Sequence, residues 1–168
     1  AVYSVIEVKQ SLTKTSLESA MEKIVMYKRL ERSRSEYGRI VENHVLQQFN
    51  QSNRYLNYRF DSIISVFCDK NELHSLIEYF FKINNQLPDK DKVNSLAILG
   101  HAYTYYATRK ENVYYEALYP EEKPTEIIPC YIPSNTDAFY RLWINLWQHL
   151  TLTVLDTSGL KHAYGRGG

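Results

Sequence analysis

The sequence predicts an α/β fold in which flanking helices cover a mixed sheet. Three apolar, β-branched runs have the pattern of strands, at residues 2–9, 58–68 and 93–100. Segments with helical spacing separate these runs, and a strand followed by a crossover helix and another apolar strand indicates a parallel pair. Two tyrosine-rich runs further along the chain have the pattern of a hairpin. Mixed α/β is therefore the predicted class.

The first half of the chain is expected to hold one strand and then two helices. Residues 2–9 form the strand, and Thr15 and Glu18 have the spacing of a capping box at the start of the first helix. Apolar residues at helical spacing support this helix, namely Leu17, Ala20, Met21, Ile24 and Tyr27. A second helix is expected over about residues 36–50, where Ile40, Val41, Val45 and Leu46 form a similar stripe.

The second half of the chain is expected to alternate strands and helices. The predicted elements are a strand at 58–68, a helix at 71–83, a strand at 93–100, hairpin strands at 102–108 and 112–119, and a helix at 137–155. Gly100 ends the strand before it, and Pro88 marks a loop. The segment 120–133 contains four prolines and shows no clear period, so no element is predicted there.

Length and composition are those of one globular domain. The chain has 168 residues, 44% of them hydrophobic, and a chain of this size buries a sizeable core. Residues 1–163 are expected to form a single domain and residues 164–168 a flexible tail. Because Ala1 opens directly in a strand, we expect the sequence to be the C-terminal portion of a larger protein.

Charge and cysteine usage restrict the partners and the location. Twenty basic and 19 acidic residues give a net charge of +1, so any phosphate contact has to come from a local patch. Cys68 and Cys130 have no Cys or His at zinc-site spacing and are expected to be reduced thiols. No apolar stretch is long enough to span a bilayer, and the N-terminus does not read as a signal peptide. The expected location is the cytoplasm, with no membrane partner.

The last predicted helix carries two apolar stripes. The first consists of Phe139, Leu142, Leu146, Leu150 and Val154, and the second of Tyr140, Trp143 and Trp147. Two apolar faces indicate burial on both sides or a partner helix. Burial within the protein, against an N-terminal segment that precedes Ala1, is the first interpretation, and a homodimer contact is the second.

Glu7 and Lys9 form the pattern that points to chemistry. Side chains alternate along a strand, so these two share one face and stand about 7 Å apart. Metal-dependent phosphodiester hydrolysis needs carboxylates to hold a hard cation such as Mg²⁺, and a cation to position water and stabilise charge on the phosphate. Glu7 suits the metal ligand and Lys9 the ammonium. The alternative is an exposed ion pair on a half-buried strand, which contributes little to stability.

The segment VYSVIEVKQSLTKTSLESAMEKI, residues 2–24, resembles the second catalytic motif of the PD-(D/E)XK nuclease superfamily. It is most similar to a bacterial family of unassigned activity within that superfamily. The core of the restriction-endonuclease-like fold has the order αβββαβ, and its third strand carries the E-x-K motif. Residues 2–9, 15–30 and 60–68 match the later half, so the resemblance implies a partial restriction-endonuclease-like core.

The resemblance also implies an activity, which is Mg²⁺-dependent cleavage of nucleic acid, with DNA the favoured substrate. Glu7 would ligate the metal, and Lys9 would position water and stabilise the transition state. In the superfamily a separate aspartate on the preceding strand completes the metal site. That aspartate would lie in the missing N-terminal segment, because Asp61 and Asp69 flank a strand that is expected to sit elsewhere in the sheet. The isolated chain is therefore expected to be inactive.

Several weaker candidates for nucleic-acid contact lie beyond the motif. Gln10 follows the lysine and is a candidate phosphate ligand, although a polar residue closing a strand is the plainer interpretation. A basic run contains Lys23, Lys28, Arg29, Arg32, Arg34 and Arg39. Arg29 and Arg32 of this run, together with Lys14, are selected as candidate contacts to the nucleic-acid backbone. A solvated helix surface is the favoured interpretation of the run. Tyrosines of the hairpin suit base stacking or, more commonly, cross-strand packing.

Two other functions remain open at the level of sequence. The first is a non-catalytic module that keeps the nuclease-like fold and binds nucleic acid or protein. The second rests on Arg39 and His44, whose R-x-x-x-x-H spacing resembles the motif of HEPN ribonucleases, which cleave RNA without a metal. That family is all-helical, and the strands of this chain argue against it.

Overall fold

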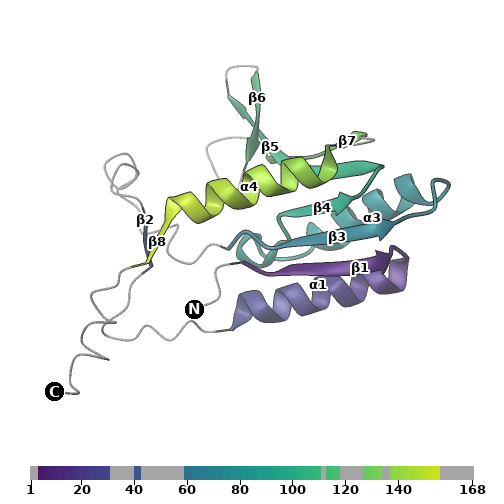
Figure 1. Cartoon of the computed structure of the whole chain (residues 1–168), viewed down its shortest axis with the longest axis horizontal. Helices are drawn as coiled ribbons and strands as arrows, with labels where there is room; N and C mark the ends of the chain where they lie inside the picture. Colours follow the sequence, from purple (N-terminus) through teal and green to yellow (C-terminus); the bar gives the residue numbers. More distant parts are fainter. Residues whose placement is uncertain are drawn as a thin grey trace.

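A mixed sheet with helices on both faces forms the centre of the molecule (Figure 1). The structure is a computed structural model and describes residues 4–30, 40–42, 59–110, 113–117, 127–133 and 137–155. Its larger sheet has six strands in the order β1-β3-β4-β5-β6, and β7 also pairs with β5. The predicted α/β class is confirmed. Residues 164–168, the predicted tail, lie outside the described residues.

The sheet joins a parallel half to an antiparallel half. The parallel strands are β1 (Ile6–Ser11), β3 (Ser62–Phe67) and β4 (Ser95–Ile98). The antiparallel strands are β5 (Ala102–Lys110), β6 (Val113–Ala117) and β7 (Ile127–Pro133). The predicted crossover pairs and hairpin are therefore present. No element was predicted in 120–133, and this prediction is wrong, because β7 lies in that segment. Among the described strands β7 pairs with β5 alone, and a strand at the edge of a sheet tolerates proline.

Helices α1 (Lys14–Arg29) and α3 (Leu73–Asn84) cover one face of the sheet, and α4 (Ala138–Leu152) covers the other (Figure 1). The short 3₁₀ helix η2 (Asp89–Asp91) leads from α3 to β4. The larger core lies beneath α1 and α3 and includes Leu17, Ile24, Ile63, Phe80 and Leu96. A smaller core lies beneath α4 and consists of Phe60, Ala97, Tyr103, Ala138 and Leu142. The sheet thus separates two apolar layers.

Helix α1 is capped two residues earlier than predicted. The N-cap is Thr13, whose Oγ1 accepts the backbone N–H of Ser16 at 3.2 Å, while Ser16 Oγ accepts the N–H of Thr13 at 2.8 Å. This reciprocal pair satisfies two backbone donors at the helix start. Glu18, predicted as the partner of Thr15, instead accepts a hydrogen bond from the hydroxyl of Tyr79 on α3. The predicted capping box is therefore wrong, since a T-x-x-S pair precedes the T-x-x-E pair.

The helix predicted over residues 36–50 is wrong at its centre. Residues Ile40–Glu42 form β2, which pairs antiparallel with β8 (Thr153–Leu155) in a second, two-stranded sheet. Two β-branched residues in β2 suit a strand once a partner strand is available. For the same reason α4 ends at Leu152, and the predicted continuation of that helix to Leu155 is wrong. The rest of the predicted helix lies outside the described residues.

Candidate functional site

The acidic and the basic side chain of the E-x-K pattern lie together on β1. Glu7 lies opposite Ile63 in the register with β3, and Ile63 belongs to the core beneath α1, so Glu7 and Lys9 share the face that α1 covers. The Nζ of Lys9 lies 2.9 Å from Oε1 of Glu7, and the side chains of Lys9 and Glu7 are 17% and 20% exposed. The shared face agrees with the strand alternation, and the catalytic role of the pair stays a prediction.

A second ammonium group reaches the same carboxylate from α1. The Nζ of Lys23 lies 3.0 Å from Oε1 of Glu7, and the side chain of Lys23 is 52% exposed. The sequence placed Lys23 in the basic run but did not predict this contact. Strand and helix rise could have found it, because Glu7 lies about 13 Å back along β1 from Ser11, and Lys23 lies about 13 Å along α1 from Lys14.

The two lysines determine the charge state of Glu7. Partial burial alone would raise the pKa of Glu7, because it disfavours the charged form. The hydrogen bonds and positive charges of Lys9 and Lys23 act in the opposite direction and outweigh burial, so the pKa of Glu7 lies below its ordinary value. The carboxylate is therefore ionised at neutral pH and available as an oxygen ligand or hydrogen-bond acceptor.

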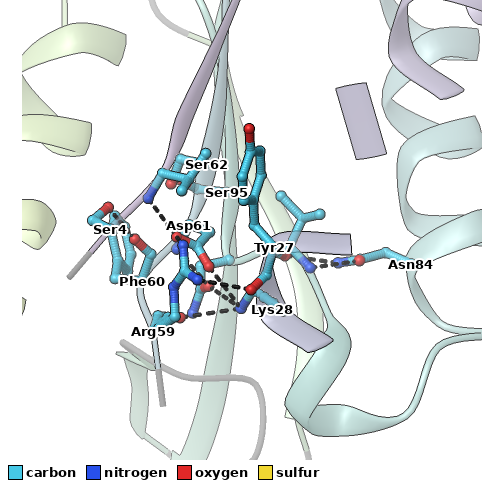
Figure 2. A network of polar contacts seen from close by, with 12 residues as sticks. Ser4, Tyr27, Lys28, Arg59, Phe60, Asp61, Ser62, Asn84 and Ser95 are labelled. Carbon is cyan, nitrogen blue, oxygen red and sulfur yellow. Dashed lines mark hydrogen bonds and ion pairs between the residues drawn. The ribbon is translucent and has the colours of Figure 1, made fainter. Parts of the chain in front are cut away.

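A buried carboxylate, that of Asp61, fixes the start of β1 (Figure 2). It accepts the backbone N–H of Val5, two residues before Glu7. Its Oδ1 lies 3.1 Å from Nη2 of Arg59, and its Oδ2 lies 3.9 Å from Nζ of Lys28. All three charged side chains are buried. The strand that carries the E-x-K pattern is thus tied to the strand beside it through a side chain as well as through the sheet.

The same network anchors the C-terminal end of α1 (Figure 2). Arg59 donates from Nη1 to the backbone carbonyl of Tyr27 at 2.8 Å, and Lys28 donates to the carbonyl of Arg59 at 3.1 Å and to Oδ1 of Asn94 at 2.9 Å. The carbonyl end of a helix carries partial negative charge, so it helps to balance two buried cations that face one carboxylate. Because α1 is held at both ends, Lys23 is presented to Glu7 from a fixed helix.

The described residues alone do not fit a metal ion. A hard cation such as Mg²⁺ takes several oxygen ligands, and nowhere in the described ranges do three His, Cys, Asp or Glu side chains come together. Oε1 of Glu7 is engaged by two ammonium groups. The expectation that the strand after Asp61 sits elsewhere in the sheet is wrong, because β3 pairs directly with β1. Asp61 therefore shares the face of Glu7, but Val5 and Arg59 engage its Oδ1, and Nζ of Lys28 lies 3.9 Å from its Oδ2. Glu7 therefore fits one ligand of such an ion, and further acidic ligands have no counterpart in the described part of the chain.

The weaker sequence candidates are not gathered around Glu7. Gln10 is exposed and, by alternation, lies on the opposite face of β1. Lys14 lies at the start of α1, with its Nζ 5.5 Å from the centre of the Tyr79 ring. Arg29 pairs through Nε with Oδ2 of Asp91 at 2.9 Å. Nucleic-acid contacts of these residues stay predictions, and Arg32, like Arg39 and His44 of the ribonuclease-like motif, lies outside the described residues.

Two tyrosines of β5 are buried and take part in the packing of the sheet against the helices. Tyr103 and Tyr106 are buried, with Tyr103 in the core beneath α4. Asn145 of α4 donates a hydrogen bond to the hydroxyl of Tyr103 at 2.7 Å, and Asn84 of α3 donates to that of Tyr106 at 2.7 Å. Burial raises the pKa of Tyr106, which keeps this hydroxyl protonated. For these two residues the structure supports the packing interpretation over base stacking.

Helix α4 has one buried and one exposed face. Leu142 and Ala138 are buried against the sheet. The exposed aromatic face, as we call it, consists of Phe139, Tyr140, Trp143 and Trp147, each at least half exposed. The predicted burial of both stripes is therefore not seen within the described residues, and the predicted homodimer contact stays a prediction. Among the helices that the structure describes, none has the length and apolarity needed to cross a membrane.

Comparison with solved structures finds similar folds in NucC proteins. NucC of P. aeruginosa ATCC27853, in its cAAA-bound form, matches with a TM-score of 0.54 and 13% identity over 99% of this chain and 60% of the NucC chain. NucC of E. coli MS115-1 matches in its apo form with a TM-score of 0.51 and 14% identity, over 97% of this chain and 63% of the NucC chain. Its cAAA-bound form gives 0.52 and 15% identity, over 97% and 58%.

These likenesses show the fold alone, because the identities are low. The chain shares a mixed α/β fold with NucC, and membership of the PD-(D/E)XK superfamily, which the E-x-K segment resembles, stays a prediction. It spans about 60% of the length of the P. aeruginosa NucC chain. No protein-family model matches the chain, and no curated protein does.

Proposed function

We propose that this chain forms the E-x-K part of a metal-dependent nuclease that hydrolyses phosphodiester bonds of nucleic acid, with DNA as the substrate. The observation that carries the proposal is the pairing of Glu7 and Lys9 on one face of β1, within a nuclease-like fold. An isolated E-x-K triplet would carry little weight. In this fold, on a strand that precedes a capped helix, it has the expected context.

Each residue of the pair has a role that follows from its chemistry. Lys9 donates from its ammonium group to a non-bridging phosphate oxygen, where negative charge grows as water attacks phosphorus. Because Lys9 is mostly shielded from water, that interaction is screened less than it would be at a fully exposed site. Glu7 orients the ammonium of Lys9 and is the proposed metal ligand. The further ligands that Mg²⁺ requires come, in this proposal, from residues outside those described.

The test is cleavage of plasmid DNA and of single-stranded DNA by the full-length protein. Reactions contain Mg²⁺ or Mn²⁺, or EDTA as the control, each with and without cAAA, because two of the similar NucC structures hold that ligand. We expect cleavage that requires a divalent cation and falls by about 100-fold or more in Glu7→Gln and in Lys9→Ala. Lys82→Ala, an exposed lysine on α3, is the matched control and should retain activity. Cleavage that survives both site substitutions would overturn the proposal.

A non-catalytic binding module on the same fold is the second candidate. It is favoured by one observation, which is that two ammonium groups face a single carboxylate in the candidate site. If the full-length protein binds nucleic acid and no cation, with or without cAAA, produces cleavage, this function replaces the nuclease.

A further inference from the structure

Lys9 and Lys23 approach one carboxylate oxygen from two different elements. Their Nζ atoms lie 2.9 and 3.0 Å from Oε1 of Glu7, one from β1 and the other from α1. Two ammonium groups and one carboxylate leave one positive charge in excess. We propose that Lys9 and Lys23 together form a subsite for one phosphate group of the nucleic-acid backbone, with Lys23 as a substrate-contacting residue. This inference rests on the proposed function, because it concerns the same face of β1.

The hydrogen-bonding capacity of the two lysines exceeds what Glu7 uses. An ammonium group has three N–H donors. Within the described residues, the hydrogen bonds and ion pairs of Lys9 and Lys23 are those to Glu7. Each lysine therefore retains donors for a phosphate oxygen. A phosphodiester carries one negative charge, so its binding between the two ammonium groups neutralises the excess charge of the cluster.

The position of Lys23 suits contact with a large substrate. Lys23 is 52% exposed, whereas Lys9 and Glu7 are mostly shielded, so the subsite has an inner and an outer cation. The flexible stem of a lysine lets the outer ammonium group move towards a phosphate without a shift of the helix. Glu18, an acidic residue on the same helix, is directed to Tyr79 of α3 and not to the subsite.

The helix that carries Lys23 is fixed before any substrate binds. Its start is capped by Thr13 and Ser16. Its end is held by Arg59, which donates to the carbonyl of Tyr27, one helical turn beyond Lys23. Preorganisation of this kind lowers the entropic cost of binding, because only the side chain has to be ordered.

Metal-free binding tests the subsite separately from catalysis. The full-length protein is titrated against a fluorescein-labelled DNA duplex in EDTA, by anisotropy, at several KCl concentrations. Lys23→Ala and Lys23→Gln should weaken binding about five- to tenfold and reduce the salt slope of log Kd by about 0.9, the value for one lost phosphate contact. Lys23→Arg should restore both quantities, and Lys82→Ala should match the wild type. Circular dichroism confirms that each variant is folded.

The outcomes separate the subsite from the nuclease proposal. Wild-type affinity and salt slope in Lys23→Ala and Lys23→Gln would overturn the subsite, as would a wild type that does not bind the duplex in EDTA. In either case the nuclease proposal stands if the wild type cleaves DNA with a metal. If binding depends on Lys23 and no cation gives cleavage, the subsite is supported and the nuclease proposal fails.

Discussion

At the scale of single residues, the buried carboxylate of Asp61 connects more elements of the fold than the sequence indicates. Its pairing with Arg59 and Lys28 links the start of β1, the start of β3 and the end of α1. The sequence alone offers Asp61 only as a poor substitute for the missing metal ligand. Burial is set by the tertiary fold, so no local pattern could have shown that this acid is enclosed by two cations.

Replacing Asp61 should therefore destabilise the protein strongly. Asp61→Asn keeps the size of the side chain and removes the negative charge that Arg59 and Lys28 face in the buried network. We expect the free energy of unfolding to fall by about 3–5 kcal/mol, as is typical when one partner of a buried ion pair is removed. Urea denaturation followed by circular dichroism measures this change.

An exposed acid–histidine pair of the same chain provides the control for Asp61. His74 and Glu78 lie 3.0 Å apart on α3, and both side chains are 67% exposed. Glu78→Gln should leave the urea midpoint unchanged, because exposed pairs contribute little. Equal destabilisation by the two substitutions would contradict the central role assigned to Asp61.

At the scale of elements, the prediction of helices and strands was correct where the apolar periodicity is strong. It failed where the type of element depends on pairing with a strand that is distant in the sequence. Strand β1, helix α1 and strand β3 were located correctly, because each has a clear run or stripe of apolar residues. The segment around β2 was predicted as a helix from its apolar spacing, and it became a strand because β8 supplies its partner. The shared face of Glu7 and Lys9 was predictable from alternation alone, whereas the contact of Lys23 could be found only by combining strand and helix rise with the assumption that α1 returns along β1.

The cap of α1 allows a direct comparison of the predicted and observed helix start. Thr13→Ala removes the side chain that accepts the N–H of Ser16, and we expect it to lower the free energy of unfolding by about 1 kcal/mol. Thr15→Ala removes the predicted cap, which is exposed and lies within the first turn, and should have little effect. Urea denaturation measures both variants. A larger loss in Thr15→Ala would mean that the helix starts where the sequence pattern placed it.

At the scale of the whole molecule, the sequence was enough to predict the fold class, but it was not enough to identify a complete metal site. The α/β class and the mixed sheet with flanking helices agree with the sheet order and with the likeness to NucC. The metal site could not be completed, because the described residues provide Glu7 and no cluster of acids. The single domain over residues 1–163, the missing N-terminal segment, the homodimer and the cytoplasmic location stay predictions.

The arrangement of α4 has a consequence for spectroscopy. The chain contains two tryptophans, Trp143 and Trp147, and both belong to the exposed aromatic face, across the sheet from Glu7 and Lys9. Their intrinsic fluorescence therefore acts as a reporter of contacts on α4. An oligonucleotide that binds beside Glu7 should leave the emission maximum unchanged, whereas any partner that covers α4 should shift it to shorter wavelength. A blue shift on addition of DNA would place the nucleic acid on the opposite side of the sheet from the one argued above.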